Sequence, residues 1–361
     1  MPTPRRSARK TDSVMFDTVT FRTERRKPPA YELRRLGFFK PHDGAGARWL
    51  WKPPAGSRQP RIKWTSSQSG DYLTVFEVSL PKLLYGNNVE TIKTDAEVMR
   101  AVDSLSVMAS DITGTDCDLR RWDVVRLDAC HSWDVTETEV TARIKALGGA
   151  HVNRMKPEPY PHGMYWKTDS GTLLAYSKHS DLCEAIREGE DIPDEVLKAS
   201  VGNFRLERRF MKRPAIKRSI VKPFGLGNER AENVLRANIA EAIINEDIMA
   251  LNLDKPLESG DARKARLLER CDGFNNKFFR LSAFLDAYAD PYLRERMKSE
   301  MNDQTFRNYR KELEAVGVLL DNPQPETYAA LPLMRHDEAS GTDSITIQPN
   351  QKFLGVTEWV N

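Results

Sequence analysis

The chain has few cysteines, and none of them is arranged for metal binding. Its 361 residues include four, Cys117, Cys130, Cys183 and Cys271, and no two are spaced as CxxC. A disulfide-bonded scaffold and a structural zinc site are therefore not expected, and the thiols are predicted to be reduced. The chain also lacks a GxxxxGK[ST] loop, so it contains no signature of an ATP-binding P-loop.

Long apolar runs are missing as well. No segment approaches the roughly 20 apolar residues that a membrane helix needs, and residues 1–10 are polar and basic, unlike a signal peptide. With 40% apolar residues, the chain is long enough for one large domain or two ordinary ones. A soluble, cytoplasmic, globular protein is therefore expected.

The net charge of +3 is small, but the charges are unevenly distributed. Residues 1–40 contain eleven Lys and Arg against four Asp and Glu, and residues 204–222 contain eight against one. Such blocks are often just solvated surface, yet two of them near polar strands favour a nucleic-acid partner. Residues 181–196, with seven acids and one arginine, are expected to form a helix that faces away from DNA.

Three segments, residues 123–130, 171–179 and 202–210, alternate apolar with polar residues and are predicted to be β-strands. Side chains two residues apart lie on the same face of a strand, so Arg126 and Asp128 share one face. The same spacing groups Arg205 with Glu207 and Arg209, and Tyr176 with Lys178.

If these strands belong to one sheet, carboxylates, a tyrosine and several cations converge on one surface. Carboxylate oxygens suit Mg²⁺ or Mn²⁺, a phenol is a possible nucleophile, and cations bind phosphate. This combination is what phosphodiester transesterification requires.

The order of predicted elements indicates an α+β fold. It has a largely antiparallel sheet with helices on one face, followed by a helical module. Strands are expected at 15–22 and 72–79 and helices at 95–112 and 134–147, besides the three segments above. Later helices are expected at 229–245, 261–270, 277–288, 291–301 and 303–316. The predicted divisions are a basic arm over 1–14, a nuclease-like domain over 15–218, a helical DNA-binding or accessory domain over 219–322 and a tail over 323–361.

Two further features allow alternative interpretations. Trp49, Trp51 and Trp64 lie among Lys and Arg. This pattern indicates either a β-hairpin that simply carries these side chains or a surface on which the bases of a single strand stack. Helices 291–301 and 303–316 resemble a helix-turn-helix, although two amphipathic helices usually just pack together.

Several motifs, in order, resemble the filamentous bacteriophage replication initiators, the gene II/X type of rolling-circle endonuclease. The resemblance covers roughly residues 15–320. It rests on Met15–Asp17, Phe76–Val89, Arg126–Asp128, Ala175–His179, Arg205–Glu207 and Asp303–Gly317.

The resemblance implies an enzyme that nicks one strand of the double-stranded phage origin and later closes the displaced strand. A tyrosine becomes linked to the DNA 5′ end, and the 3′ hydroxyl is extended by host polymerase. By position the nucleophile is Tyr176, with Tyr165 as the second candidate. The implied metal ligands are Asp128 and Glu207, with Glu77 as a third candidate.

The resemblance also implies residues that bind or activate phosphate. Lys178 and Lys82 would bind it, His179 would polarise water or a leaving oxygen, and Arg126 would neutralise charge or brace the carboxylates, as would Arg205. Other expected DNA contacts are Arg209, Lys212, Arg213, Arg307 and Arg310. In the structural alternative, Asp128 and Glu207 are simply ion-paired to Arg126 and Arg205.

The chain departs from related nucleases that bind metal through a His-apolar-His motif, because none of its six histidines is spaced in that way. A site of carboxylates suited to Mg²⁺ or Mn²⁺ is therefore expected. Host helicase, host polymerase and the bacterial cytoplasm follow only from the resemblance. Two alternatives remain: a catalytically silent protein that binds the origin or single strands, and an initiator of conjugative transfer.

Overall fold

The computed structural model describes residues 15–41, 48–54, 57, 59–148, 150, 152, 155, 157–257, 260–271, 273, 275–315 and 328–334. The arm predicted over residues 1–14 and most of the tail predicted over 323–361 lie outside these ranges. No helix in the described ranges is both long and apolar enough to cross a bilayer.

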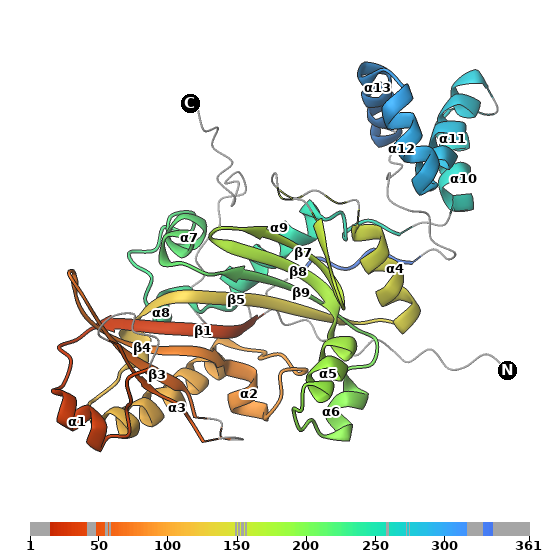
Figure 1. Ribbon diagram of the computed structural model, residues 1–361. Helices are drawn as coiled ribbons and strands as arrows, with labels where there is room; N and C mark the ends of the chain where they lie inside the picture. Colours follow the sequence, from red (N-terminus) through yellow and green to blue (C-terminus); the bar gives the residue numbers. More distant parts are fainter. Residues whose placement is uncertain are drawn as a thin grey trace.

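One antiparallel sheet dominates the structure (Figure 1). Its strand order is β2-β3-β4-β1-β5-β9-β8-β7-β6. The strands are β1 (Met15–Glu24), β2 (Arg48–Trp51), β3 (Arg61–Ser67), β4 (Gly70–Ser79), β5 (Asp123–Asp134), β6 (Pro157–Tyr160), β7 (Gly163–Thr168), β8 (Gly171–Ser177) and β9 (Asn203–Phe210). The predicted α+β fold with a largely antiparallel sheet is confirmed. The five predicted strands form the middle of the sheet, and β2, β3, β6 and β7 extend it at both ends.

Helices pack on the sheet and also form a separate group after it. The first set comprises α1 (Ala30–Arg35), α2 (Leu80–Tyr85), α3 (Asp95–Thr113), α4 (Glu137–Leu147), α5 (Lys178–Arg187), α6 (Asp194–Ala199), α7 (Arg213–Ile216), α8 (Ala231–Val234) and α9 (Ala237–Ala250). The second comprises α10 (Gly260–Arg270), α11 (Asn276–Ala289), α12 (Pro291–Glu300) and α13 (Asp303–Ala315).

Local sequence explains where α3 begins and ends. The Thr94 side chain accepts a hydrogen bond from the backbone N–H of Glu97, and Gly114 ends the helix with a φ of 66°. Between these caps, Val98, Val102 and Leu105 recur at helical spacing and are fully buried. Helix α3 therefore contributes to the same apolar core as α4 and α9.

The two faces of the sheet differ in chemistry. Leu127, Ala129 and Leu206 point into the core beneath the helices. The alternate positions on β5 and β9 carry charged side chains, including Asp128 and Glu207. One face of the sheet is thus apolar and covered, and the other is polar.

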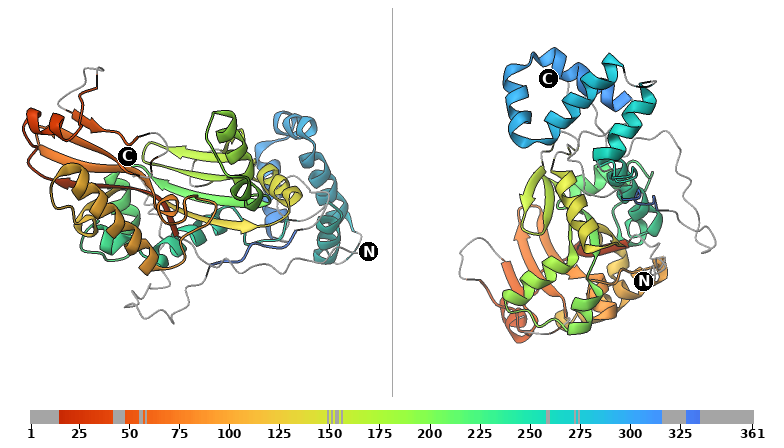
Figure 2. Two further views of the ribbon diagram at one scale, coloured as in Figure 1. Left: turned by 90° about the horizontal axis from the view of Figure 1, so that it is seen from below. Right: turned by 90° about the vertical axis from the view of Figure 1, so that its right-hand side faces the viewer.

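The sheet's core extends beyond the division predicted at residue 218. Ile216 of α7 and Ile239, Ile244 and Ile248 of α9 belong to that core. The helix predicted over 229–245 is divided into α8 and α9. In contrast, α10–α13 pack around their own cluster and stand apart from the sheet (Figures 1 and 2).

The chain returns to the sheet after the α10–α13 group. Leu257 and Tyr328 pair as an isolated β-bridge, so the segments entering and leaving the group lie side by side. Asn245 of α9 exchanges two hydrogen bonds with the backbone of Met334, at 2.9 and 2.7 Å. Residues 328–334 of the predicted tail are therefore anchored on the sheet unit.

Candidate active site

The three strands that carry the predicted site residues are neighbours in the sheet, in the order β5-β9-β8. Asp128 lies opposite Arg209 across the β5–β9 pair, and Tyr176 lies opposite Arg205 across the β8–β9 pair. Because antiparallel partners share a face, the tyrosine, the carboxylates and the arginines lie on one surface.

Tyr176 and the two carboxylates belong to a continuous chain of contacts. The Tyr176 hydroxyl donates to Glu207 Oε2 at 3.0 Å, and Arg209 Nε donates to Glu207 Oε1 at 2.6 Å. Arg209 Nε is also 3.9 Å from Asp128 Oδ2. Arg126 donates to both oxygens of Asp128, at 3.2 and 2.8 Å.

The chain of contacts continues toward the β3 side of the sheet through Glu77. Its Oε1 lies 3.6 Å from Arg126 Nη1, and its Oε2 lies 3.3 Å from Arg61 Nη1. Charged side chains of alternating sign therefore extend from Glu207 on β9 to Arg61 on β3.

Burial makes the centre of this chain electrostatically unusual. Asp128, Glu207 and Tyr176 are only 1%, 3% and 5% exposed. Burial, and after it the nearby charge of Glu207, raises the pKa of Asp128 to about 7 against the opposing effect of the hydrogen bonds from Arg126. Burial, followed by the charge of Glu207, raises the pKa of Tyr176 well above its usual range. At neutral pH the phenol is protonated and acts as a hydrogen-bond donor.

Arg205 is a structural brace rather than an exposed cation. It is 1% exposed and donates to Ser132 Oγ at 2.8 Å and to the carbonyl of Asn88 at 2.6 Å. Its Nη1 lies 3.7 Å from Asp17 Oδ2. Arg205 thus joins β9 to β5, β1 and the loop after α2. The ion pair expected between Arg205 and Glu207 in the structural alternative is not formed, because Glu207 pairs with Arg209 instead.

Lys178 and His179 open α5, directly after β8. Lys178 is buried and forms an ion pair with Asp181 at 2.7 Å, while burial lowers its pKa. His179 Nδ1 lies 3.0 Å from Ser200 Oγ, in the segment after α6. Both side chains therefore have protein partners next to Tyr176.

Tyr165, the second candidate nucleophile, lies outside this chain of contacts. It stands on β7, and its hydroxyl donates to Glu158 Oε2 on β6. That hydrogen bond raises the pKa of the Tyr165 phenol. Tyr176, in contrast, bonds directly to one of the predicted metal ligands.

The remaining predicted DNA contacts are scattered. Lys82 is exposed on α2, Lys212 is exposed just before α7, and Arg213 forms ion pairs with Asp123 at 2.8 Å and with Glu229. Arg307 and Arg310 lie on α13, where they pair with Asp303 at 3.9 Å and Glu314 at 3.6 Å. Arg307 and Arg310 thus belong to the helical group, far along the chain from the contacts around Tyr176.

Asp128 and Glu207 are the candidate ligands for a divalent cation. Within the described residues, no three or more His, Cys, Asp or Glu side chains are close enough together to hold a metal ion. Asp128 and Glu207 nevertheless supply two carboxylates in a buried setting, where the charge of Glu207 helps to raise the pKa of Asp128. Mg²⁺ is commonly held by one or two carboxylates together with water and substrate phosphate, so this pair fits such an ion.

Sequence reasoning missed several residues that shape the site. Asp17 accepts from Ser79 Oγ at 2.6 Å and lies beside Arg205, although the sequence indicates it only as part of a motif. Asp181 follows Lys178 at helical i,i+3 spacing, a signal that is present in the sequence. Arg61 has no local signal, because its relation to Arg126 depends on strand pairing.

Comparison with known proteins gives one result. A family model described as "Replication-associated protein G2P N-terminal" matches residues 39–226, which include Asp128, Tyr176 and Glu207 but neither β1 nor α10–α13. No curated protein and no solved structure matches the chain. Since the family match spans more than half of the 361 residues, the chain belongs to this family, that of the filamentous phage gene II replication initiators.

Proposed function

We propose that the chain is a site-specific DNA endonuclease that nicks and later closes one strand, initiating and ending rolling-circle replication of a filamentous phage genome. The observation that carries this proposal is the hydrogen bond of 3.0 Å from Tyr176 to Glu207, next to Asp128 on the same face. All three residues lie within the family match.

Tyr176 is the proposed nucleophile. An ordinary phenol, with a pKa near 10, is ionised in about one molecule in a thousand at pH 7, and the raised pKa of Tyr176 reduces that fraction. A proton acceptor is therefore needed at the moment of attack, and Glu207 Oε2 already accepts the phenol hydrogen. As Oη bonds to phosphorus, the phenol proton passes to Glu207, the bond from phosphorus to the DNA 3′ oxygen breaks, and that oxygen takes a proton from solvent to leave as a hydroxyl.

The products follow from this exchange. The 5′ phosphate stays on Tyr176 as a phosphodiester, and a 3′ hydroxyl is released, which host polymerase would extend while a host helicase separates the strands. Since one phosphodiester replaces another, a later attack by a 3′ hydroxyl closes the strand without ATP. The missing P-loop is consistent with this chemistry.

Asp128 and Glu207 would hold Mg²⁺ or Mn²⁺, with Glu77 as a third candidate ligand. When bound, such an ion stabilises charge on the scissile phosphate. The support is the burial of both carboxylates and the raised pKa of Asp128, which a bound cation would lower. Arg126 and Arg209 hold these carboxylates in place and add positive charge beside them.

The other cations are assigned by their surroundings. Arg205 holds the neighbouring strands and the loop after α2 together on the same face, as its buried contacts indicate. Lys178 and His179 lie beside the nucleophile and would act on a phosphate once DNA displaces their protein partners. Lys82, Lys212 and Arg213 would contact DNA phosphates nearby, and Arg307 and Arg310 would do so from α13.

A catalytically silent DNA-binding protein is the second candidate. It is favoured by the low exposure of Tyr176 and by the arginine partners that already occupy both carboxylates. In that case the contacts around Tyr176 would serve folding, and the basic surfaces alone would be functional.

The test uses supercoiled plasmid that carries the cognate origin, with Mg²⁺ or EDTA, and denaturing gels that detect nicked DNA and covalent protein. The proposal requires metal-dependent nicking and an adduct that disappears in Tyr176→Phe. Tyr165→Phe is the matched control and should retain both. Binding without cleavage in any divalent metal would support the catalytically silent protein. An adduct that persists in Tyr176→Phe but is absent in Tyr165→Phe would identify Tyr165 as the nucleophile.

A further inference from the structure

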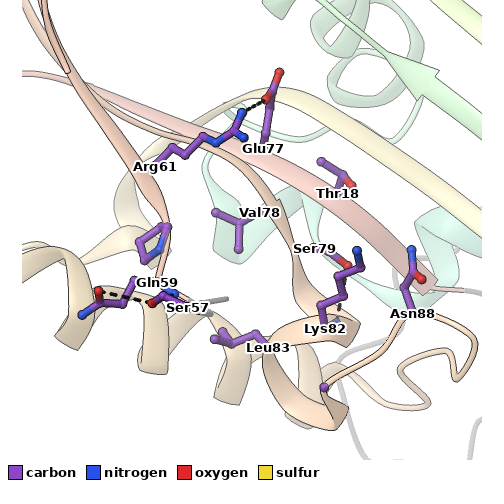
Figure 3. A pocket seen from close by; sticks show the side chains of 12 residues that line it. Thr18, Ser57, Gln59, Arg61, Glu77, Val78, Ser79, Lys82, Leu83 and Asn88 are labelled. Atoms are coloured by element: carbon purple, nitrogen blue, oxygen red, sulfur yellow. Dashed lines mark hydrogen bonds and ion pairs between the residues drawn. The ribbon is translucent and has the colours of Figure 1, made fainter. Parts of the chain in front are cut away.

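A polar groove borders the far end of the chain of contacts described above (Figure 3). Its volume is about 490 Å³. It is lined by backbone and side chains that come from the segment before β3, from β1 and β4, and from α2 and the following loop. The polar residues among them include Arg61, Lys82, Ser79, Thr18 and Asn88.

The groove is connected to the candidate active site through one carboxylate. Glu77 lines the groove and pairs with Arg61 at 3.3 Å on one side and with Arg126 at 3.6 Å on the other. Arg126 in turn binds Asp128. A DNA strand that lies along the polar face would therefore reach the groove without crossing an apolar surface.

Unusual backbone geometry places Glu77 at this position. Its φ is 54°, which is rare for a residue other than glycine. The β1–β4 register shifts between Val19 and Phe21, so β4 contains a bulge opposite this shift. The Glu77 N–H donates to Thr20 Oγ1 at 3.2 Å, which holds the bulge. Bulges of this kind often re-aim a side chain next to a functional site.

The cations of the groove are available to a ligand. Lys82 is exposed, and its ammonium has no ion-pair partner within the described part of the chain. Arg61 and Glu77 form a pair whose side chains are 56% and 49% exposed. Such an exposed pair adds little stability, so a phosphate can replace Glu77 as the partner of Arg61 at small cost.

The position of the groove sets the size of its ligand. From β4 to β8 there are four inter-strand steps, which together span about 19 Å at ordinary sheet spacing. A ligand that occupies both Tyr176 and the groove must therefore be several nucleotides long. The described residues that line the groove include no aromatic ring, so the groove suits the sugar-phosphate backbone rather than stacked bases.

We propose that this groove is a subsite for the single-stranded DNA that flanks the scissile phosphate on one side, with Lys82 and Arg61 binding its phosphates. This inference rests on the proposed nuclease function for the identity of the strand. It adds Arg61, which no local pattern in the sequence identifies, and it assigns Lys82 to the flank rather than to the reacting phosphate.

The first experiment measures binding without cleavage. Full-length Tyr176→Phe protein in EDTA is titrated with fluorescent dT16 at several salt concentrations, alone and with Arg61→Ala and Lys82→Ala combined. Each phosphate that is no longer bound should lower the slope of log affinity against log salt by about 0.7, so the double change should lower it by about 1.4. Lys167→Ala, an exposed lysine on β7, is the matched control. An unchanged slope would overturn the proposal.

The second experiment locates the flank. Oligonucleotides of the cognate origin strand, shortened from either end, are bound to the same proteins. The double variant should bind the full oligonucleotide about tenfold more weakly than its parent protein does. Once the end that occupies the groove has been removed, the two proteins should bind with equal affinity. An equal loss for every oligonucleotide would mean that no flank occupies the groove. Both experiments measure binding and do not depend on nicking. The groove proposal can therefore be refuted while adduct formation is observed, and it can be supported while no adduct forms.

Discussion

Charged residues are used differently in the sheet unit and in the α10–α13 group. In the sheet unit, Arg208 and Asp247 are 39 residues apart in sequence, buried and joined by two hydrogen bonds. In the helical group, Arg296 and Glu300 are four residues apart on α12, and their side chains are 57% and 63% exposed. Both are ion pairs between an arginine and a carboxylate, but their surroundings differ.

The comparison shows that buried and exposed ion pairs differ in how strongly each charge depends on its partner. A buried ion pair depends on its partner, because either charge alone would remain desolvated. An exposed pair on one helix is screened by water and contributes little. Residues around Asp128 and Glu207 follow the first pattern, and Arg307 and Arg310 follow the second. Substitutions in the two regions should therefore differ in effect.

Glu207→Gln should reduce adduct formation on origin DNA by about 10²–10⁴-fold, since an amide cannot take the proton from Tyr176. The measurement is the single-turnover rate of covalent protein–DNA formation in Mg²⁺. Glu158→Gln removes the carboxylate that Tyr165 contacts and should leave this rate unchanged. The reverse result, with Glu158→Gln inactive, would identify Tyr165 as the nucleophile.

Asp247→Ala should lower the free energy of unfolding by about 3–5 kcal/mol, because it leaves the Arg208 guanidinium buried without its partner. Glu300→Ala, the matched change in the helical group, should cost below about 0.5 kcal/mol. Urea unfolding followed by circular dichroism measures both. Similar losses in the two variants would contradict the contrast between the regions.

Asp128→Asn should alter how stability depends on pH. The pKa of Asp128 is raised from 3.8 to about 7 in the folded protein. The unfolded chain loses this proton near pH 4, so wild type loses stability relative to the variant as pH rises from about 4 to 7. Between pH 5 and pH 8 the variant should therefore gain about 2–3 kcal/mol relative to wild type.

Thermal or urea unfolding of both proteins at pH 5, 6, 7 and 8 measures this difference. A difference that is constant across the range would show that Asp128 is ionised throughout it. The same ionisation should appear in activity if the carboxylate binds metal, with Mg²⁺-dependent nicking falling as the pH drops below about 7. Raising the Mg²⁺ concentration should then restore activity.

Arg307→Ala combined with Arg310→Ala should change the free energy of unfolding by less than about 1 kcal/mol, since both residues form exposed pairs within α13. If α13 contacts duplex DNA, the salt slope of origin binding should fall by about 0.9 for each phosphate that the variant no longer binds. Lys298→Ala on α12 is the control. An unchanged slope would leave α13 out of the DNA interface.

Much of the sheet was predictable because its strands alternate strictly. The segments at 123–130 and 202–210 became β5 and β9, and their spacing correctly grouped Arg126 with Asp128 and Glu207 with Arg209. Helix α3 was equally clear from its apolar spacing. In these elements, local chemistry and tertiary packing favour the same conformation.

Other features depended on contacts that sequence does not reveal. The helix predicted over 229–245 is broken near Leu235, which is fully buried in the sheet's core. The sequence places Arg205 either at the scissile phosphate or against the carboxylates, whereas the structure buries it against Ser132 and Asn88 and pairs Glu207 with Arg209. The edge strands β2, β3, β6 and β7 are short or surrounded by Pro and Gly, so their periodicity is weak.

The amino-acid sequence alone establishes which side chains share a face of each strand, because that follows from the two-residue repeat of an extended backbone. It also establishes the family, through the motifs around Asp128, Tyr176 and Glu207. Which strands are neighbours emerged only in the folded chain, and with it the bond from Tyr176 to Glu207 and the connection of Arg61 through Glu77 to Arg126. Strand order is set by the packing of the whole sheet, since pairing partners can lie anywhere along the chain.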